Sequence, residues 1–199
     1  MKSTLAKVLY VAGVTTFCTF LGCWALLAHQ ASQQTAVSAV SDESFAKKAA
    51  QGAMTEVKLG QLAQDKGTNE AVKKFGQRMV QDHSKANDEL KQAATKENIT
   101  LPGDVDKKDQ DTYDALSNLS GTAFDKAYAR DMVKDHQEDI AEFQREAHGG
   151  QKDAIKSFAA ETLPTLQDHL KEAREMRQAV ASLKVTKAKS TSSGHAGPR

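Results

Sequence analysis

The sequence predicts an all-α protein whose main domain is a four-helix bundle. Only 3 prolines and 12 glycines interrupt its 199 residues, and the unbranched side chains that are common elsewhere lose little rotamer freedom in a helix. Apolar side chains recur at spacings of three and four in four long segments, which is the period of one helix face. We therefore predict three parts: a signal peptide or membrane anchor over 1–39, the bundle over 40–183, and a disordered basic tail over 184–199.

The first part has the order of an export signal. Lys2 and Lys7 precede an uncharged run over 8–28, and a small-residue site follows at 37–39. This order is typical of a cleaved signal, but a run of 21 residues is also long enough to cross a bilayer as an uncleaved anchor. Lipidation at Cys23 is a third alternative. All three alternatives predict an exported protein, either in the periplasm or tethered to a membrane and facing the periplasm.

Charge and cysteine content restrict the partners and chemistry of the bundle. Residues 40–183 hold all 26 acidic side chains and 21 of the 27 basic ones, a net charge of −5. An acidic body of this kind is a poor nucleic-acid binder, so we expect no nucleic-acid partner. Membrane contact is expected only through 8–28, and the sequence names no protein partner. Both cysteines, Cys18 and Cys23, precede the bundle, so no disulfide or cysteine-based site is expected in it.

Cap and turn residues delimit the first two long helices. A serine and an aspartate at 41–42 can cap the first helix, because their oxygens accept free backbone N–H groups, and Gly67 is a good stop. The threonine and asparagine at 68–69 can cap the second helix, which ends near Asn98. A break follows, and a short extra helix is predicted over 105–119.

The third and fourth long helices form a second predicted hairpin. Gly121 and Thr122 open the third helix, the pair Gly149-Gly150 marks a tight turn, and the fourth helix extends to about Val180. Two short turns and one long connection give the order hairpin, crossover, hairpin. This is the arrangement seen in ferritin-like four-helix bundles.

Each long helix carries one polar side chain on its apolar stripe: Glu56, His83, His136 and His169. Two of these histidines end a repeated stretch, MVQDH at 79–83 and MVKDH at 132–136. In each repeat the histidine follows a methionine by four residues, so both lie on the same helix face. Within each hairpin the two polar residues differ by only about 6–7 Å in height. The long connection hides the register between hairpins, so a single layer of all four is a hypothesis.

Two interpretations of these inward polar residues are open. Imidazoles and a carboxylate are good ligands for Zn, Fe, Mn or Cu, and bundle cores build metal sites from facing helices. Asp82, Asp135 and Asp168 directly precede the histidines, and we expect them to orient imidazoles of neighbouring helices. The other interpretation is a buried hydrogen-bond network that fixes helix register. No phosphate loop, G-x-S-x-G or H-E-x-x-H motif is present, so we lean against an enzyme.

Three segments resemble the family called domain of unknown function 4142: FAKKAAQGAMTEVKLGQLAQDKGTNEAVKKFGQRMVQDHSKANDELKQAA, LSGTAFDKAYARDMVKDHQEDIAEFQREA and IKSFAAETLPTLQDHLKEA. The resemblance covers roughly 45–175 in order and implies an exported bacterial envelope protein with a ferritin-like bundle. The family has no settled activity. Its recurring polar positions fall here on Glu56, Asp82, His83, Asp135, His136 and His169.

The sequence differs from di-iron proteins of the ferritin-like class, which carry Glu-x-x-His on two helices. Here the residues three before the histidines are Val80, Val133 and Leu166. The leading hypothesis is a non-catalytic exported bundle that serves envelope stress tolerance. The alternative is a metal-binding bundle, for storage, scavenging or redox work, that uses the glutamate and the three histidines.

Overall fold

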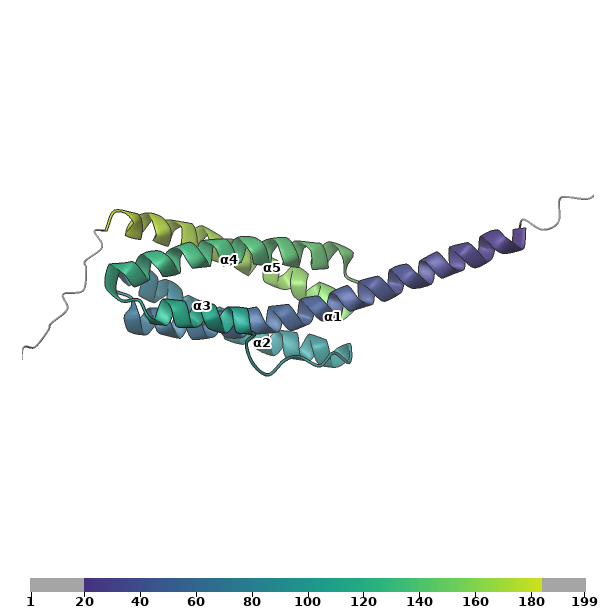
Figure 1. The fold of residues 1–199 in the computed structure, drawn as a ribbon, viewed down its shortest axis with the longest axis horizontal. Helices are drawn as coiled ribbons and strands as arrows, with labels where there is room; N and C mark the ends of the chain where they lie inside the picture. Colours follow the sequence, from purple (N-terminus) through teal and green to yellow (C-terminus); the bar gives the residue numbers. More distant parts are fainter. Residues whose placement is uncertain (1–19, 184–199) are drawn as a thin grey trace, which may run out of the picture. The chain divides into compact units, whose positions relative to one another are not determined.

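A computed structural model describes residues 20–183, with side chains from residue 42 onward. The chain divides into two units, 1–37 and 38–199, and the bundle lies in the second. The helices of the described part are α1 (Phe20–Lys66), α2 (Glu70–Lys96), α3 (Lys107–Ser117), α4 (Gly121–Gly149) and α5 (Asp153–Ala181) (Figure 1). Regular structure in this part is all helical, which confirms the predicted class.

The predicted stops and the predicted cap at 68–69 are confirmed. Helix α1 ends one residue before Gly67, and α2 is capped by Asn69, whose side chain accepts a hydrogen bond from the N–H of Ala71 at 2.8 Å. After α2, Asn98 takes a left-handed conformation with φ 56°, which asparagine tolerates better than most residues. The short helix predicted over 105–119 is α3.

The start of the first helix differs from the prediction. Helix α1 runs without a break through residues 41–42, so neither of these residues caps it. Asp42 is instead buried, and its Oδ2 accepts hydrogen bonds from the N–H groups of Gln151 at 2.8 Å and Lys152 at 2.6 Å. The carboxylate therefore holds the turn that leads into α5, 109 residues further along the chain. A sequence pattern assigns such a carboxylate to its nearest helix, whereas here the tertiary fold brings it to a distant turn.

Contacts at the two ends fix the direction of each helix. At one end, Asp125 near the start of α4 accepts hydrogen bonds from Thr68 and Asn69 in the α1–α2 turn. At the other end, Glu97 after α2 accepts a hydrogen bond from the N–H of Ala154 at the start of α5. Helices α2 and α4 therefore run parallel, and each is antiparallel to its hairpin partner. The connection with α3 returns along the bundle, where Thr55 of α1 donates to Asp109 of α3.

Two apolar clusters fill the bundle, one on either side of a polar layer. The first joins apolar side chains of α1, α2, α4 and α5 around Phe75, Phe124 and Met132. The second joins the opposite halves of the same helices around Phe143 and Phe158. On every long helix the inward polar residue falls between the segments that feed the two clusters. Burial of these clusters drives association of the helices and carries the polar residues into the interior.

Helices α1 and α2 cross at two glycines. A Cβ on Gly60 would lie 2.6 Å from the carbonyl oxygen of Gly76, and the reverse contact is the same distance. Because only glycine lets two backbones approach so closely, this crossing fixes the register of the first hairpin. Gly60 lies one turn after Glu56, so the crossing also sets the distance from that carboxylate to α2.

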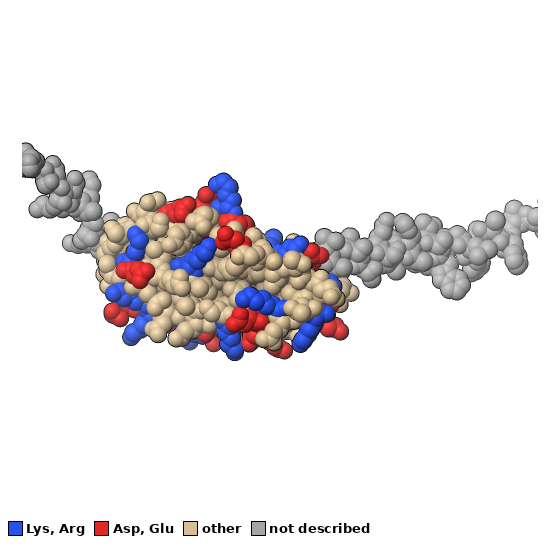
Figure 2. Space-filling view, turned by 90° about the horizontal axis from the view of Figure 1, so that it is seen from below, with Lys and Arg blue, Asp and Glu red and all other residues tan. Residues whose placement is uncertain are grey.

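One face of the bundle is mixed in charge. On the face in Figure 2, basic and acidic side chains are interspersed among uncharged ones. None of the helices in the described part combines the length and apolarity needed to cross a bilayer. The predicted signal or anchor run over 8–28 lies for the most part outside the described residues, and so does the predicted tail over 184–199.

Candidate metal centre

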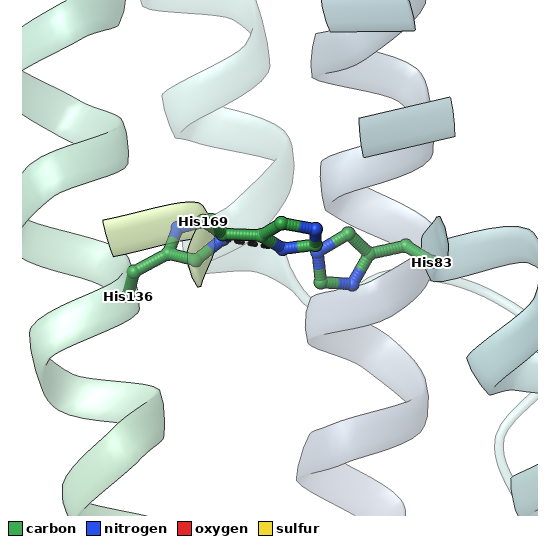
Figure 3. A group of neighbouring side chains, drawn as sticks. All are labelled: His83, His136 and His169. Atoms are coloured by element: carbon green, nitrogen blue, oxygen red, sulfur yellow. Dashed lines mark hydrogen bonds between the residues drawn. The ribbon is translucent and has the colours of Figure 1, made fainter. Parts of the chain in front are cut away.

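The structure brings the four inward polar residues into one layer. Glu56 comes from α1, His83 from α2, His136 from α4 and His169 from α5, and each is at most 4% exposed. The Nδ1 of His83 lies 2.8 Å from Glu56 Oε2, and the Nε2 of His136 lies 3.4 Å from Glu56 Oε1. Figure 3 shows the three imidazole rings pointing toward one another from separate helices. The single-layer hypothesis is therefore confirmed.

Each imidazole uses one ring nitrogen to hold its orientation. The Nδ1 of His136 lies 3.0 Å from the carbonyl oxygen of Met132, and the Nε2 of His169 lies 2.8 Å from Asp82 Oδ2. Carbonyl and carboxylate oxygens only accept, so both of these nitrogens carry the proton and donate. His83 donates through Nδ1 to Glu56 in the same way when that carboxylate is ionised.

The second nitrogen of each neutral ring is then left with a lone pair. The Nε2 of His136 and the Nδ1 of His169 face each other at 3.3 Å, marked by the dashed line in Figure 3. The Nε2 of His83 is buried with no hydrogen-bond partner among the described residues, and Glu56 Oε1 is in the same position. Three nitrogen lone pairs and one carboxylate oxygen therefore converge on a water-poor interior.

Burial keeps these histidines neutral near pH 7. It lowers the pKa of His83 to about 4 and that of His169 to about 4. For His136, burial together with repulsion from the other two rings lowers the pKa well below its ordinary value. An imidazolium proton between two rings is thus disfavoured, because a buried charge loses its hydration.

Asp82 is ionised, and its carboxylate holds the ring of His169. Although burial acts to raise its pKa, hydrogen bonds from His169 and Arg78 hold the pKa of Asp82 below its ordinary value. Arg78 donates to Asp82 at 3.1 Å and also pairs with Glu172. An ionised carboxylate behind a histidine is the usual support of a metal-binding imidazole, since it fixes the tautomer and makes the ring more basic.

The three aspartates that precede the histidines do not share one role. Asp82 contacts His169 across the α2–α5 interface, as expected. Asp168 is exposed on α5, and the acceptors for His83 and His136 are Glu56 and Met132. The expectation that Asp135 and Asp168 orient imidazoles is therefore wrong. Residues next to each other on a helix point about 100° apart, and only the packing decides which neighbour faces a partner.

A second group, which sequence reasoning missed, adjoins the histidines. Carboxylate oxygens of Glu56, Asp135 and Asp139 lie within 4.8 Å of one another. Burial, followed by the charges of Asp109 and Asp131, raises the pKa of Glu56 to about 8. Burial and Glu56 raise the pKa of Asp135 to about 8, and the same causes raise that of Asp139 well above its ordinary value. The available signal was the spacing of four between these aspartates on α4.

The donor set and its dimensions fit a transition-metal ion. Ligand nitrogens of the three histidines lie within 4.8 Å of one another. Around a tetrahedral ion with bonds of about 2.0–2.1 Å, neighbouring ligand atoms lie about 3.3–3.4 Å apart. The observed separations from His136 Nε2 are 3.3 Å to His169 and 3.4 Å to Glu56. These residues could hold a metal with small adjustments of the side chains.

Fold and site together define a helical-bundle protein with a buried three-histidine, one-glutamate candidate metal centre. The chain belongs to the family described as domain of unknown function (DUF4142), whose model matches residues 27–176. No curated protein matches this sequence. Among solved structures it is similar to a crystal structure of a DUF305 fragment from Deinococcus radiodurans, with 11% identity and a TM-score of 0.60, covering 72% of this chain and 97% of that one. At such an identity the similarity shows the fold alone.

Proposed function

We propose that this protein binds a divalent transition-metal ion through His83, His136 and His169, with Glu56 as the fourth ligand. The proposal rests on one observation: the Nε2 of His136 and the Nδ1 of His169, each with a lone pair, face each other at 3.3 Å. Both tautomers are set by acceptors on the far side of the rings, so no hydrogen bond joins two neutral rings. A cation between them turns this repulsion into coordination.

The chemistry of the site favours binding over catalysis. Three nitrogens and one oxygen suit Zn²⁺, Cu²⁺ or Fe²⁺ better than Mn²⁺, because imidazole is a softer donor than carboxylate or water. All four ligands come from the protein, and structural sites are closed in this way, whereas catalytic zinc sites keep a position open for water. The centre therefore suits storage or scavenging.

We further propose that the domain works outside the cytoplasm, in the bacterial envelope. The order of charges and apolar residues in 1–39 supports export, and the ferritin-like order of hairpin, crossover and hairpin is compatible with metal storage. Metal scavenging is one way in which such a bundle would serve envelope stress tolerance. Fusion of residues 1–45 to a reporter that is active only in the periplasm tests this proposal, and a reporter that stays inactive would contradict it.

The competing interpretation is a closed hydrogen-bond network. Burial raises the pKa of Glu56 to about 8, so a protonated Glu56 could donate to the Nε2 of His136 across 3.4 Å. That distance is long for an O–H donor, whose hydrogen bonds are typically about 2.7–2.8 Å. The network would also leave the Nε2 of His83 without a partner. A metal accounts for all of these atoms at once.

Zinc retention distinguishes the two interpretations. We expect purified protein, loaded with Zn²⁺ and dialysed, to retain one equivalent by elemental analysis. His136→Leu fills a similar volume without a donor atom and should lower the affinity by at least about 100-fold, because loss of a second-shell group alone costs about 10–100-fold. His148→Ala is the control, since His148 is an exposed histidine on the same helix.

Two results would contradict the proposal. One is retention far below one equivalent by the unmodified protein after loading. The other is equal retention by His136→Leu and the unmodified protein, with both folded by circular dichroism. In the network interpretation His136→Leu should leave the metal content unchanged. It should be tolerated or stabilising if the buried partners that it leaves regain hydration, because a buried polar group without a partner is costly.

A further inference from the structure

The acidic group beside the histidines has the features of a second site. It consists of Glu56, Asp135 and Asp139, with carboxylate oxygens within 4.8 Å of one another. Asp131, Asp135 and Asp139 are spaced by four on α4, and like charges at this spacing destabilise a helix. Glu138 and Glu142 add charge of the same sign nearby. So many ionised carboxylates on a single helix are costly, so the group is either protonated or compensated by a cation.

The carboxylate that this group shares with the histidine layer points to a ligand here. Glu56 is 1% exposed, and its Oε1, which lies 3.4 Å from His136 Nε2, has no hydrogen-bond partner among the described residues. Within residues 42–183, no lysine or arginine forms an ion pair with Glu56, Asp135 or Asp139. An unpaired carboxylate oxygen in the interior loses its hydration without compensation. This oxygen belongs to Glu56, the residue that the acidic group shares with the histidine layer.

We propose that Glu56, Asp135 and Asp139 bind a second, hard divalent cation, with Glu56 shared between this ion and the ion held by the histidines. The proposal deepens the metal-binding function above and rests on it for the shared ligand. Oxygen ligands select ions such as Mn²⁺, Mg²⁺ or Ca²⁺, so the two sites differ in preference. A carboxylate can serve two ions through its two oxygens, which is how two-metal centres are commonly joined.

A groove gives this second site access to solvent. A cavity of about 300 Å³ is bordered by Asp135 and Asp139 of α4 and by Asp109 from the start of α3. Lys48 at its edge is engaged with Glu142 at 3.5 Å. Six acidic side chains and two basic ones, Lys48 and Lys108, line this cavity, and an opening with an excess of one sign of charge concentrates ions of the other sign. The groove therefore gives a cation access to Asp135 and Asp139, whose carboxylates adjoin that of Glu56.

Manganese binding tests the second site. The full chain, both metal-free and loaded with one equivalent of Zn²⁺, is titrated with Mn²⁺, and free Mn²⁺ is counted by its electron paramagnetic resonance signal. We expect one bound Mn²⁺ per chain. Asp139→Asn should weaken Mn²⁺ binding at least tenfold and leave Zn²⁺ retention unchanged. Glu56→Gln should weaken both, because one oxygen ligand becomes an amide nitrogen that cannot coordinate.

The control is Glu138→Gln, which removes one charge from the same helix and the same groove but lies outside the carboxylate group. It should change Mn²⁺ affinity by less than about threefold, as expected for an exposed charge screened by salt. The proposal is overturned if the unmodified chain binds no Mn²⁺, or if Asp139→Asn and Glu138→Gln behave alike. Failure of the histidine centre can be told apart from failure of the second site. If the histidine centre fails, Zn²⁺ is not retained, and the Mn²⁺ titration of the metal-free chain still tests the second site.

Discussion

Replacement of Gly60 by alanine should destabilise the bundle, even though alanine is the better helix former. The new Cβ would lie 2.6 Å from the carbonyl oxygen of Gly76, and 3.1 Å from the side chains of Met79 and Val80. The nearest of these atoms belongs to the backbone, so it cannot rotate away. To reach an ordinary contact of 3.4 Å, α1 and α2 must separate by about 0.8 Å, which disturbs a close-packed interior.

The magnitude follows from two opposing terms. Gly→Ala in a helix interior gains up to about 1 kcal/mol, whereas overpacking a core typically costs about 1–3 kcal/mol and occasionally more. Because the clash is with backbone, we expect the upper part of that range and a net loss of about 1–2 kcal/mol. Gly52→Ala is the matched control on the same helix. Its Cβ meets no atom within 4 Å, so it should stabilise by about 0.5–1 kcal/mol.

Urea unfolding followed by far-ultraviolet circular dichroism, with EDTA present, measures both free energies of unfolding. The reasoning is refuted if Gly60→Ala raises the midpoint as much as Gly52→Ala does. A second readout is metal affinity. Separation of α1 from α2 would stretch the hydrogen bond of 2.8 Å from His83 to Glu56 past the usual limit of about 3.2 Å, so Zn²⁺ should bind more weakly to Gly60→Ala than to Gly52→Ala.

Three other variants test the packing and electrostatics of the bundle. Asp125→Ala leaves the N–H groups of Thr68 and Asn69 without their acceptor and should cost about 2–4 kcal/mol in urea unfolding; a loss below about 0.5 kcal/mol would contradict that role. Tyr128→Phe removes a buried hydroxyl that has no hydrogen-bond partner among the described residues, so thermal stability should be unchanged or higher by about 1 kcal/mol, and a marked drop would reveal a missing partner. Burial, followed by the charge of Asp42, raises the pKa of Glu146 from 4.5 to about 7. The folded protein therefore binds a proton at Glu146 more tightly than the unfolded chain does. The stabilisation from this proton is complete below pH 4.5 and is lost as the pH rises through about 7. Glu146→Gln should therefore flatten stability between pH 5 and 8 relative to the unmodified protein, and parallel pH profiles would show that this carboxyl titrates normally.

The repeated stretches MVQDH and MVKDH illustrate what local pattern can and cannot predict. A spacing of four from Met79 and Met132 correctly placed His83 and His136 on the inner face, because helix periodicity fixes direction within one element. The aspartate in each repeat was harder to place. Asp82 meets His169, whereas Asp135 joins the acidic group, although the two occupy the same position in nearly identical pentapeptides.

The cap at 41–42 shows the same limit at the scale of the fold. An aspartate after a polar segment is a good helix start by local rules, yet α1 continues through it and Asp42 binds the turn before α5. A carboxylate binds whichever free N–H groups the fold brings to it. That choice depends on contacts between residues more than 100 positions apart, and no window of neighbouring sequence contains them.

By itself, the order of residues determined the helical class, the hairpins and the inward direction of Glu56 and the three histidines, one from each long helix. These properties depend on backbone preferences and a 3.6-residue period, both of which act within one segment. Only the tertiary structure decided that the two hairpins align so that Glu56 meets all three imidazoles, and that Asp139 lies beside it. Height within the first hairpin is set by the glycine crossing, and height between the hairpins by the contact of Asp125 with the first turn. These contacts exist only once the helices have packed.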